Sequence, residues 1–208
     1  MSQADLTREV ARRVFASEFN DATYTFKESD DERAPNYALL PTGDRANRVF
    51  AVGTLTETED VGDESEYWRG RVVDPTGTFF AYAGQYQPEA AAILRDAEPP
   101  EYVAVVGKPR TYEPDDGSIT VSLRPESITI VDEAIRDRWV VETATRTLDR
   151  IEAYQEWEST REDPDGGSTA PTNEYAQLAR EHYDSPVENY RQDVIQAVES
   201  LDELEATA

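Results

Sequence analysis

The chain has 208 residues, and its 44 Asp and Glu outnumber its 20 Lys and Arg, which gives a formal net charge of −24. Charged residues make up 31% of the chain, above the usual value of about 25%, and the excess is acidic. The sequence has no cysteine, which excludes disulfides, thiolate zinc sites and cysteine nucleophiles. No apolar run reaches the ~18 residues of a membrane span, and no apolar stretch follows Arg12 and Arg13 as a secretion signal requires. We therefore expect a cytoplasmic protein with no membrane partner.

A charge of this size repels itself in dilute buffer and weakens the compact state. At molar salt the Debye length is about 3 Å, so surface carboxylates scarcely interact. Lys27 and Lys108 are the only lysines, and the chain has a single Met. This composition resembles that of proteins from salt-in halophiles such as haloarchaea. The alternative is an acidic protein from an ordinary cell, such as a DNA mimic. Aromatic residues at 10% argue against wholesale disorder.

The first 46 residues are expected to form an N-terminal helix and an arm. Leu6, Val10, Val14 and Phe15 fall at helical spacing, which predicts a helix over residues 5–19 with Asp5 as its cap. Residues 22–46 alternate weakly between apolar and polar side chains around a polar turn at residues 29–33. This pattern favours a hairpin or an extended arm.

Residues 47–131 carry the densest strand signal. Strands are predicted at residues 48–56, 67–73, 78–83, 102–107 and 119–123, the last resuming at 128–131 beyond a proline. Gly53 suggests a bulge or bend in the first of them. A helix is predicted over residues 87–97, and a hairpin turn at residues 115–117. Five strands with a helix between the third and fourth are the order of an OB-fold barrel. The predicted fold class is mainly β with flanking helices (α+β).

Two helical regions follow the predicted barrel. Residues 132–158 read as one long helix, and residues 159–172 as a linker because of their Asp-Pro-Asp-Gly-Gly-Ser composition. Residues 173–208 read as a short C-terminal helical segment. In that segment Ser185 is the expected cap, Pro186 the first helical residue and Glu188 the partner of a capping box.

Enzyme chemistry finds little support. His182 is the only histidine, and its place near a helix end predicts a surface or packing role. Asp163, Asp165 and Glu174 match positions 1, 3 and 12 of a calcium loop, but Ser168 stands where such a loop requires glycine. No glycine loop of the P-loop or dinucleotide type occurs. We therefore predict no catalytic residue, no metal site and no cofactor.

The second and third strands suggest a binding face instead. Strand alternation places Arg69, Arg71, Phe80 and Tyr82 outside a barrel whose interior holds Val72 and Phe79. The hairpin between the fourth and fifth strands adds three residues to the predicted nucleic-acid-binding set: Lys108, Arg110 and Tyr112. Cations beside aromatic rings suit a single-stranded nucleic acid, because rings stack on bases while guanidinium groups meet phosphates. The alternative is that the rings belong to a core and the arginines pair with carboxylates.

Three stretches carry a family resemblance. They read NRVFAVGTL at residues 47–55, YWRGRVVDPTG at 67–77 and FFAYAGQY at 79–86. This combination resembles the haloarchaeal replication protein A-associated proteins, single OB-fold subunits similar to the middle subunit of replication protein A. The resemblance implies a non-enzymatic subunit of a single-stranded DNA-binding complex that acts in DNA replication and repair. It also implies a larger replication protein A-like subunit as partner.

The long helix at 132–158 fits such a complex, because an apolar stripe needs a cover. The predicted subunit-interface residues lie along this stripe: Ile135, Trp139, Leu148, Ile151 and Tyr154. The stripe could instead pack on its own barrel or on the final helix. A second functional alternative is an assembly protein whose barrel docks on a larger DNA-binding subunit without touching nucleic acid.

Overall fold

The computed structural model describes residues 9–31, 34–115, 117–162, 173–184 and 186–205. Its main sheet has the strand order β1-β5-β6-β7-β9-β8, and pairing of β5 with β8 closes it into a barrel. The barrel elements are β5 (Val49–Asp60), β6 (Trp68–Asp74), β7 (Gly77–Ala83), α2 (Pro88–Asp96), β8 (Glu101–Tyr112) and β9 (Thr120–Ile130). With α2 between the third and fourth barrel strands, this is the OB-fold order, and the predicted fold class is confirmed.

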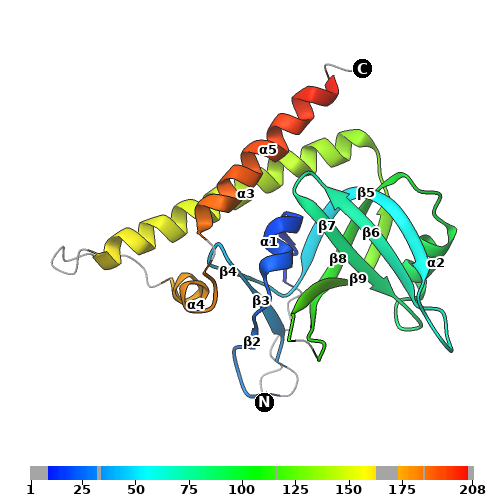
Figure 1. Ribbon diagram of the computed structural model, residues 1–208, viewed down its shortest axis with the longest axis horizontal. Helices are drawn as coiled ribbons and strands as arrows, with labels where there is room; N and C mark the ends of the chain where they lie inside the picture. The colour runs from blue at the N-terminus through cyan, green and yellow to red at the C-terminus, as the bar shows by residue number, and fades with distance from the viewer. Residues whose placement is uncertain (1–8, 32–33, 116, 163–172, 185, 206–208) are drawn as a thin grey trace, which may run out of the picture.

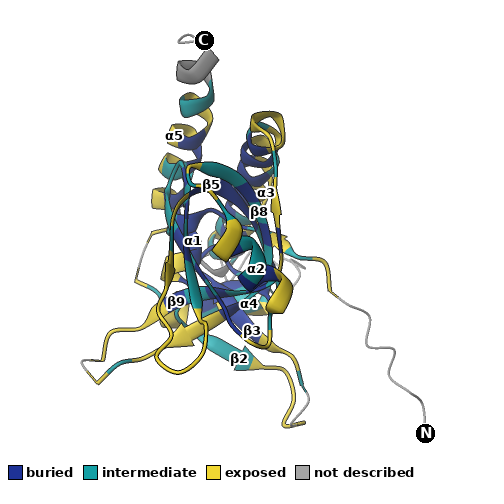
Figure 2. Cartoon of the chain, turned by 90° about the vertical axis from the view of Figure 1, so that its right-hand side faces the viewer, coloured by how far each residue is buried: buried dark blue, intermediate teal, exposed yellow. Residues whose placement is uncertain are grey.

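Strand alternation fills the barrel interior. Inward-facing Leu55, Val72 and Phe79 are fully buried, and Leu94 of α2 packs against them. A Cβ built on Gly70 would come within 2.6 Å of Leu94 Cδ2, so glycine at this position lets α2 approach β6 closely. Figure 2 shows buried residues following the barrel wall and the inner sides of α1 and α3.

The irregular points of the barrel differ from the expected ones. The register shift in β5 falls between Leu55 and Glu57, not at Gly53. Gly53 instead permits a close approach, because a Cβ there would lie 2.4 Å from the carbonyl oxygen of Val73. β9 runs unbroken through Pro125, which pairs with Gly107 beside a second register shift. The fifth strand therefore continues beyond the proline, as predicted, but without a break.

The helix predicted over residues 5–19 is confirmed only at residues 16–19 and is wrong for residues 9–15. Residues 1–8 lie outside the described ranges, and β1 (Arg12–Arg13) pairs in parallel with β5. The helix α1 (Ala16–Asp21) starts only after Phe15. The backbone N–H of Arg12 donates to the carbonyl oxygen of Arg48, so pairing with a distant strand outweighs the local helical pattern.

Residues 25–46 form a small antiparallel sheet, which answers the choice between hairpin and arm. Its strands, in the order β2-β3-β4, are β2 (Thr25–Lys27), β3 (Asn36–Leu40) and β4 (Asp44–Ala46). Gly43 turns the chain between β3 and β4 with φ of +82°, a value that L side chains rarely adopt. The helix α4 (Glu174–His182) packs on this turn, since a Cβ on Gly43 would come within 2.9 Å of Ala176 Cα.

The helices after the barrel are α3 (Glu133–Glu162), α4 and α5 (Val187–Glu205). α3 continues to residue 162, into the region predicted as a linker. The rest of that region, 163–172, lies outside the described residues, and so do Asp163 and Asp165 of the rejected calcium loop. The C-terminal segment holds two helices rather than one. The Asn173 side chain caps α4 by accepting from the N–H of Ala176, whereas the expected cap Ser185 is outside the described residues. In the described ranges no helix is long and apolar enough to cross a membrane.

The long helix α3 packs on its own chain. Figure 1 shows it running beside the barrel and α5. Trp139 is buried, donates its indole N–H to the Phe50 carbonyl oxygen at 3.0 Å and meets the Phe15 ring edge-on. Ile151 and Tyr154 are buried in a second cluster with Leu39 of the small sheet. These interface candidates therefore form internal packing, and the prediction of a free interface at them is corrected.

The two remaining interface candidates differ from each other. Leu148 is partly buried against the barrel cluster, and Ile135 keeps 45% of its surface exposed. The sequence showed that the stripe needs a cover, and the barrel and α5 supply most of that cover.

A buried ionic network joins α1, α3 and the β3–β4 turn. Arg150 of α3 donates to Glu18 Oε2 at 2.6 Å, to Thr42 Oγ1 at 2.9 Å and to Thr147 Oγ1 at 3.1 Å. It also donates to the carbonyl oxygen of Arg13 at 3.4 Å, while Thr42 donates to Glu18 Oε1. Buried charges require such partners, so the network fixes how the barrel, α3 and the small sheet meet.

Candidate nucleic-acid interface

Strand register aligns the predicted binding residues on one outer face of the barrel. Arg69 stands opposite Tyr82, and Arg71 opposite Phe80, on the β6–β7 pair. Lys108 stands opposite Arg124 on the β8–β9 pair. The parallel contact between β7 and β9 brings these two pairs of strands together. Cations therefore flank the two aromatic side chains on both sides, as strand alternation predicted.

A groove of about 590 Å³ lies in this face. Its lining consists of Tyr67, Arg69, Phe80, Tyr82, Arg110, Thr111, Tyr112, Thr120, Val121 and Ser122. Five predicted binding residues are in this lining: Arg69, Phe80, Tyr82, Arg110 and Tyr112. The other two, Arg71 and Lys108, lie on the same strands outside it.

Two loops wall the groove. In the β5–β6 connection, the Asp60 carboxylate accepts from the N–H groups of Gly62 and Tyr67, both at 3.0 Å. These hydrogen bonds lower the pKa of Asp60, because they favour its charged form. On the opposite wall, Tyr112 of the β8–β9 hairpin is largely exposed. In an OB-fold, oligonucleotides bind on the second and third strands between these two loops.

Arg69 is the most constrained cation of the face. It pairs with Glu59 at 2.5 Å and with Glu57 at 3.7 Å, and its guanidinium carbon lies 5.8 Å from the Phe80 ring centroid. The two carboxylates neutralise its charge, so Arg69 is placed to position the Phe80 ring rather than to attract an anion.

The remaining cations of the face have no carboxylate partner in the part of the chain that the structure describes. Among the described side chains, Arg71, Lys108, Arg110 and Arg124 form no ion pair, and Arg71 donates only to the Thr56 hydroxyl, at 3.2 Å. Every other described arginine side chain pairs with Asp or Glu. In a chain with a net charge of −24, the described arginines without an ion pair thus lie on one outer face of the barrel, and Arg110 lines its groove.

Like charges crowd this part of the face. Burial lowers the pKa of Lys108, and the positive charges of Arg48, Arg124 and Arg110 lower it further against the opposing effect of Glu126. Burial also lowers the pKa of Arg124, with Arg110 adding to the effect. An anion placed among these groups would relieve their mutual repulsion.

Sequence reasoning missed two prominent members of the site. Arg124 continues the outward alternation of Ser122, but the predicted strand stopped at residue 123, just before it. Tyr67 was predicted as the first residue of the second strand and was not chosen as a site residue, whereas in the structure it precedes β6. Its position in the groove follows from the loop held by Asp60.

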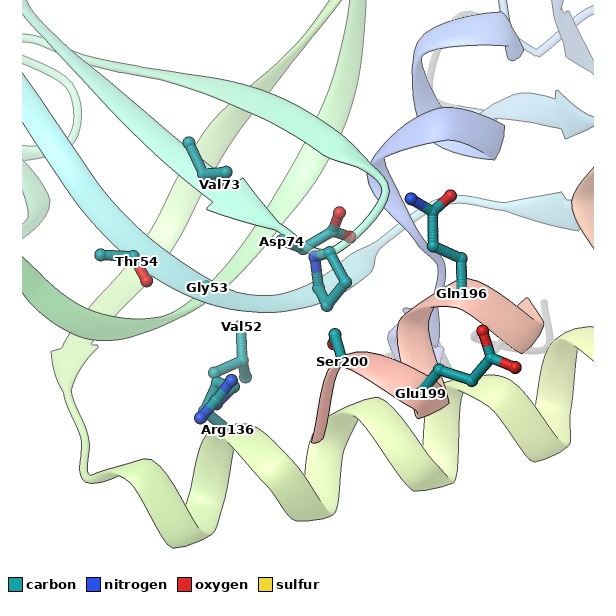
Figure 3. A pocket seen from close by; sticks show the side chains of 10 residues that line it. Val52, Gly53, Thr54, Val73, Asp74, Arg136, Gln196, Glu199 and Ser200 are labelled. Carbon is teal, nitrogen blue, oxygen red and sulfur yellow. The ribbon is translucent and has the colours of Figure 1, made fainter. Parts of the chain in front are cut away.

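A second cavity of about 530 Å³ lies between the barrel and the helices α3 and α5. Figure 3 shows the lining residues and their elements: Val52, Gly53 and Thr54 of β5, Arg136 of α3, and Gln196, Glu199 and Ser200 of α5. Asp74 and Arg136 also line it. Arg136 lies 2.7 Å from the Asp137 carboxylate and 3.1 Å from Glu133, so its charge is balanced.

Asp74 has local partners as well. Its carboxylate accepts from the N–H groups of Ala16, Thr76 and Gly77 and from the Thr76 hydroxyl. Burial raises the pKa of Asp74 to about 6, against the lowering effect of these bonds. Asp74 and Arg136, two of the three charged residues in the cavity lining, are therefore engaged in holding the fold; the third is Glu199 of α5.

His182 occupies a packing position. Its ring stacks on Tyr24 with a centroid distance of 3.6 Å at the end of α4. In the described part of the chain, no group of three or more His, Cys, Asp or Glu side chains is arranged to hold a metal ion.

The barrel and its outer groove define an OB-fold protein. No family model matches the chain, and no curated protein matches it. Among solved structures, the S. pombe Stn1–Ten1 complex matches at 12% identity over 84% of this chain and 100% of that chain, with a TM-score of 0.47. The S. cerevisiae mitochondrial single-stranded DNA-binding protein Rim1 matches at 22% identity over 41% of this chain and 92% of that chain, with a TM-score of 0.32. Similarity at this level concerns the barrel fold alone.

Proposed function

We propose that this chain is a non-enzymatic OB-fold subunit that binds single-stranded DNA in its outer groove. The observation that carries the proposal is the position of four cations, Arg71, Lys108, Arg110 and Arg124, on the outer face that holds the aromatic groove, with no ion pair among the described side chains. A merely solvated acidic surface would pair these cations with its abundant carboxylates, as it pairs the other described arginines.

Base stacking supplies most of the affinity in this mechanism. Phe80, Tyr82 and Tyr112 stack on bases, each stack contributing about 1–3 kcal/mol. The unpaired cations meet phosphates, but phosphate contacts weaken linearly with the logarithm of salt concentration. In a cytoplasm at molar salt, which the acidic composition suggests, the rings therefore dominate and the cations orient the strand.

The finer assignment is a subunit of a replication protein A-like complex that acts in DNA replication and repair in a salt-in halophile. It is supported by the sequence resemblance over residues 47–86. Partner contacts would involve the surface that α3 leaves free, including Ile135. A pull-down from high-salt lysate with the full chain as bait tests it, and a larger OB-fold subunit is the expected partner.

Fluorescence anisotropy with oligo-dT at about 3 M KCl tests direct binding. Phe80→Ala or Tyr82→Ala should weaken binding about tenfold or more, and more than Arg71→Ala does. Arg138→Ala serves as the control, because Arg138 lies on α3 and pairs with Glu142. Equal losses at the rings and at Arg71, or larger losses at Arg71, would refute the stacking mechanism.

One observation favours the alternative of an assembly protein that does not touch DNA. Glu57 and Glu59 hold Arg69 at the groove and place negative charge beside it. In that case the isolated chain would show no saturable oligo-dT binding at any salt concentration, while it still associated with a DNA-binding subunit.

A further inference from the structure

The Tyr67 ring covers one face of Tyr82. The two ring centroids are 5.8 Å apart and the ring planes differ by 22°, so the rings lie nearly parallel. Tyr67 precedes β6 and is 44% exposed, and it lines the groove beside Arg69 and Phe80. A stacked pair that is half open to solvent contributes little to the core, so its place in the groove calls for another explanation.

Gly84 makes room for this ring position. A Cβ built on Gly84 would lie 2.8 Å from Tyr67 Cδ2 and 3.4 Å from Cε2. Any larger side chain at position 84 would push the Tyr67 ring out of its place. The end of β7 is thus shaped to receive an aromatic ring from the opposite loop.

Two hydrogen bonds hold the backbone of Tyr67. Its N–H donates to the Asp60 carboxylate, and its carbonyl oxygen accepts from the N–H of Val61 at 2.9 Å. These bonds fix the position of the Tyr67 backbone at the end of the β5–β6 loop. A rotation about the side-chain bonds can therefore move the ring without disturbing the loop.

A base can lie between Tyr67 and Tyr82 only if the two rings separate. Stacked aromatic planes lie about 3.5 Å apart, so two rings with a base between them stand about 7 Å apart. The observed centroid distance of 5.8 Å belongs to two nearly parallel rings stacked on each other, so the unbound pair is closed. An outward swing of Tyr67 about its side-chain bonds opens the pair to one base.

We propose that Tyr67 and Tyr82 are the two sides of a clamp that holds a single base, with Gly84 providing the space for the Tyr67 ring. The clamp rests on the proposed function, since it gives the groove one defined base position within a bound single strand. In the unbound chain the Tyr67 ring shields the Tyr82 face from water.

The test uses the full chain and oligo-dT strands that carry one 2-aminopurine at successive positions. In the wild type, one position should show the strongest quenching, because stacking between two rings quenches this base. Tyr67→Leu should weaken binding about tenfold and restore fluorescence at that position, whereas Tyr67→Phe should behave as wild type. Gly84→Ala should lower the quenching by displacing the ring.

Tyr86→Leu is the matched control, because Tyr86 follows Gly84, is 84% exposed and lies outside the groove lining. Thermal unfolding of Tyr67→Leu without DNA should match the wild type, which separates binding from folding. Wild-type affinity and quenching in Tyr67→Leu would overturn the clamp and leave the proposed function standing. Failure of the wild type to bind any strand would overturn both.

Discussion

Replacing Arg150 by Met tests whether the buried ionic network holds the parts of the chain together. The substitution keeps an unbranched apolar stem but removes four donated hydrogen bonds, to Glu18, Thr42, Thr147 and the carbonyl oxygen of Arg13. It leaves Glu18, which is 1% exposed, without its cation. Breaking a buried pair by removing one partner costs about 3–5 kcal/mol of unfolding free energy. We expect Arg150→Met to lose stability in this range.

The same helix offers a matched control one turn earlier. Arg146 pairs with Asp149 at 3.5 Å, but its side chain is 70% exposed. An exposed pair contributes less than about 1 kcal/mol, so Arg146→Met should be nearly neutral. Urea unfolding at high KCl, followed by the fluorescence of buried Trp139, measures both variants. The double variant Glu18→Met with Arg150→Met should recover part of the loss, because no buried charge is then left alone.

Two outcomes would contradict this reasoning. Equal stability of Arg150→Met and Arg146→Met would mean that the network is solvated or weak. A double variant less stable than Arg150→Met would mean that Glu18 contributes through its other contacts rather than through its pairing with Arg150.

The thermal midpoint should rise between about 0.1 M and 2 M KCl, because the Debye length falls from about 10 Å to below 3 Å; a flat profile contradicts this. Asp74 has a pKa of about 6 in the folded chain and about 3.9 in the unfolded chain. Because the folded state binds the proton more tightly, its contribution to the unfolding free energy is complete below pH ~4, and up to about 3 kcal/mol of it is lost as the pH rises through 6. Asp74→Asn should remove that slope in urea titrations. Gly43→Ala should lower the unfolding free energy by about 1–2 kcal/mol because φ at this position is +82°, and the close contact with Ala176 should add to the loss. Gly117→Ala is the control: φ is +79° there and no atom lies within 4 Å, so it measures the conformational cost alone.

The barrel was largely predictable because its signals are local. Two-residue alternation and the helix pattern that begins at Gln87 each depend on neighbouring residues. The N-terminal helix was mispredicted because Arg12 and Arg13 pair with a strand more than 30 residues away. The small sheet was only weakly indicated, since its three short strands gain stability from α4 and α3 rather than from their own pattern.

The outer face that holds the groove was predicted in outline and not in detail. Alternation placed Phe80 and Tyr82 outside because that pattern is a property of any strand. It could not show that Arg69 is neutralised or that Arg124 is free, since ion pairing depends on residues from other strands. The apolar stripe of α3 likewise showed that a cover exists, but not that Phe15 and Leu39 of the same chain provide it.

The continuity of α3 couples the local unfolding of the two ends of this helix. One uninterrupted helix contributes Trp139 to the barrel cluster and Ile151 to the cluster of the small sheet. If either cluster loses its packing, one part of α3 becomes exposed, and the order of that part also depends on the other cluster. Backbone amides of α3 should therefore exchange with solvent through one cooperative opening shared by both ends, rather than through separate local openings.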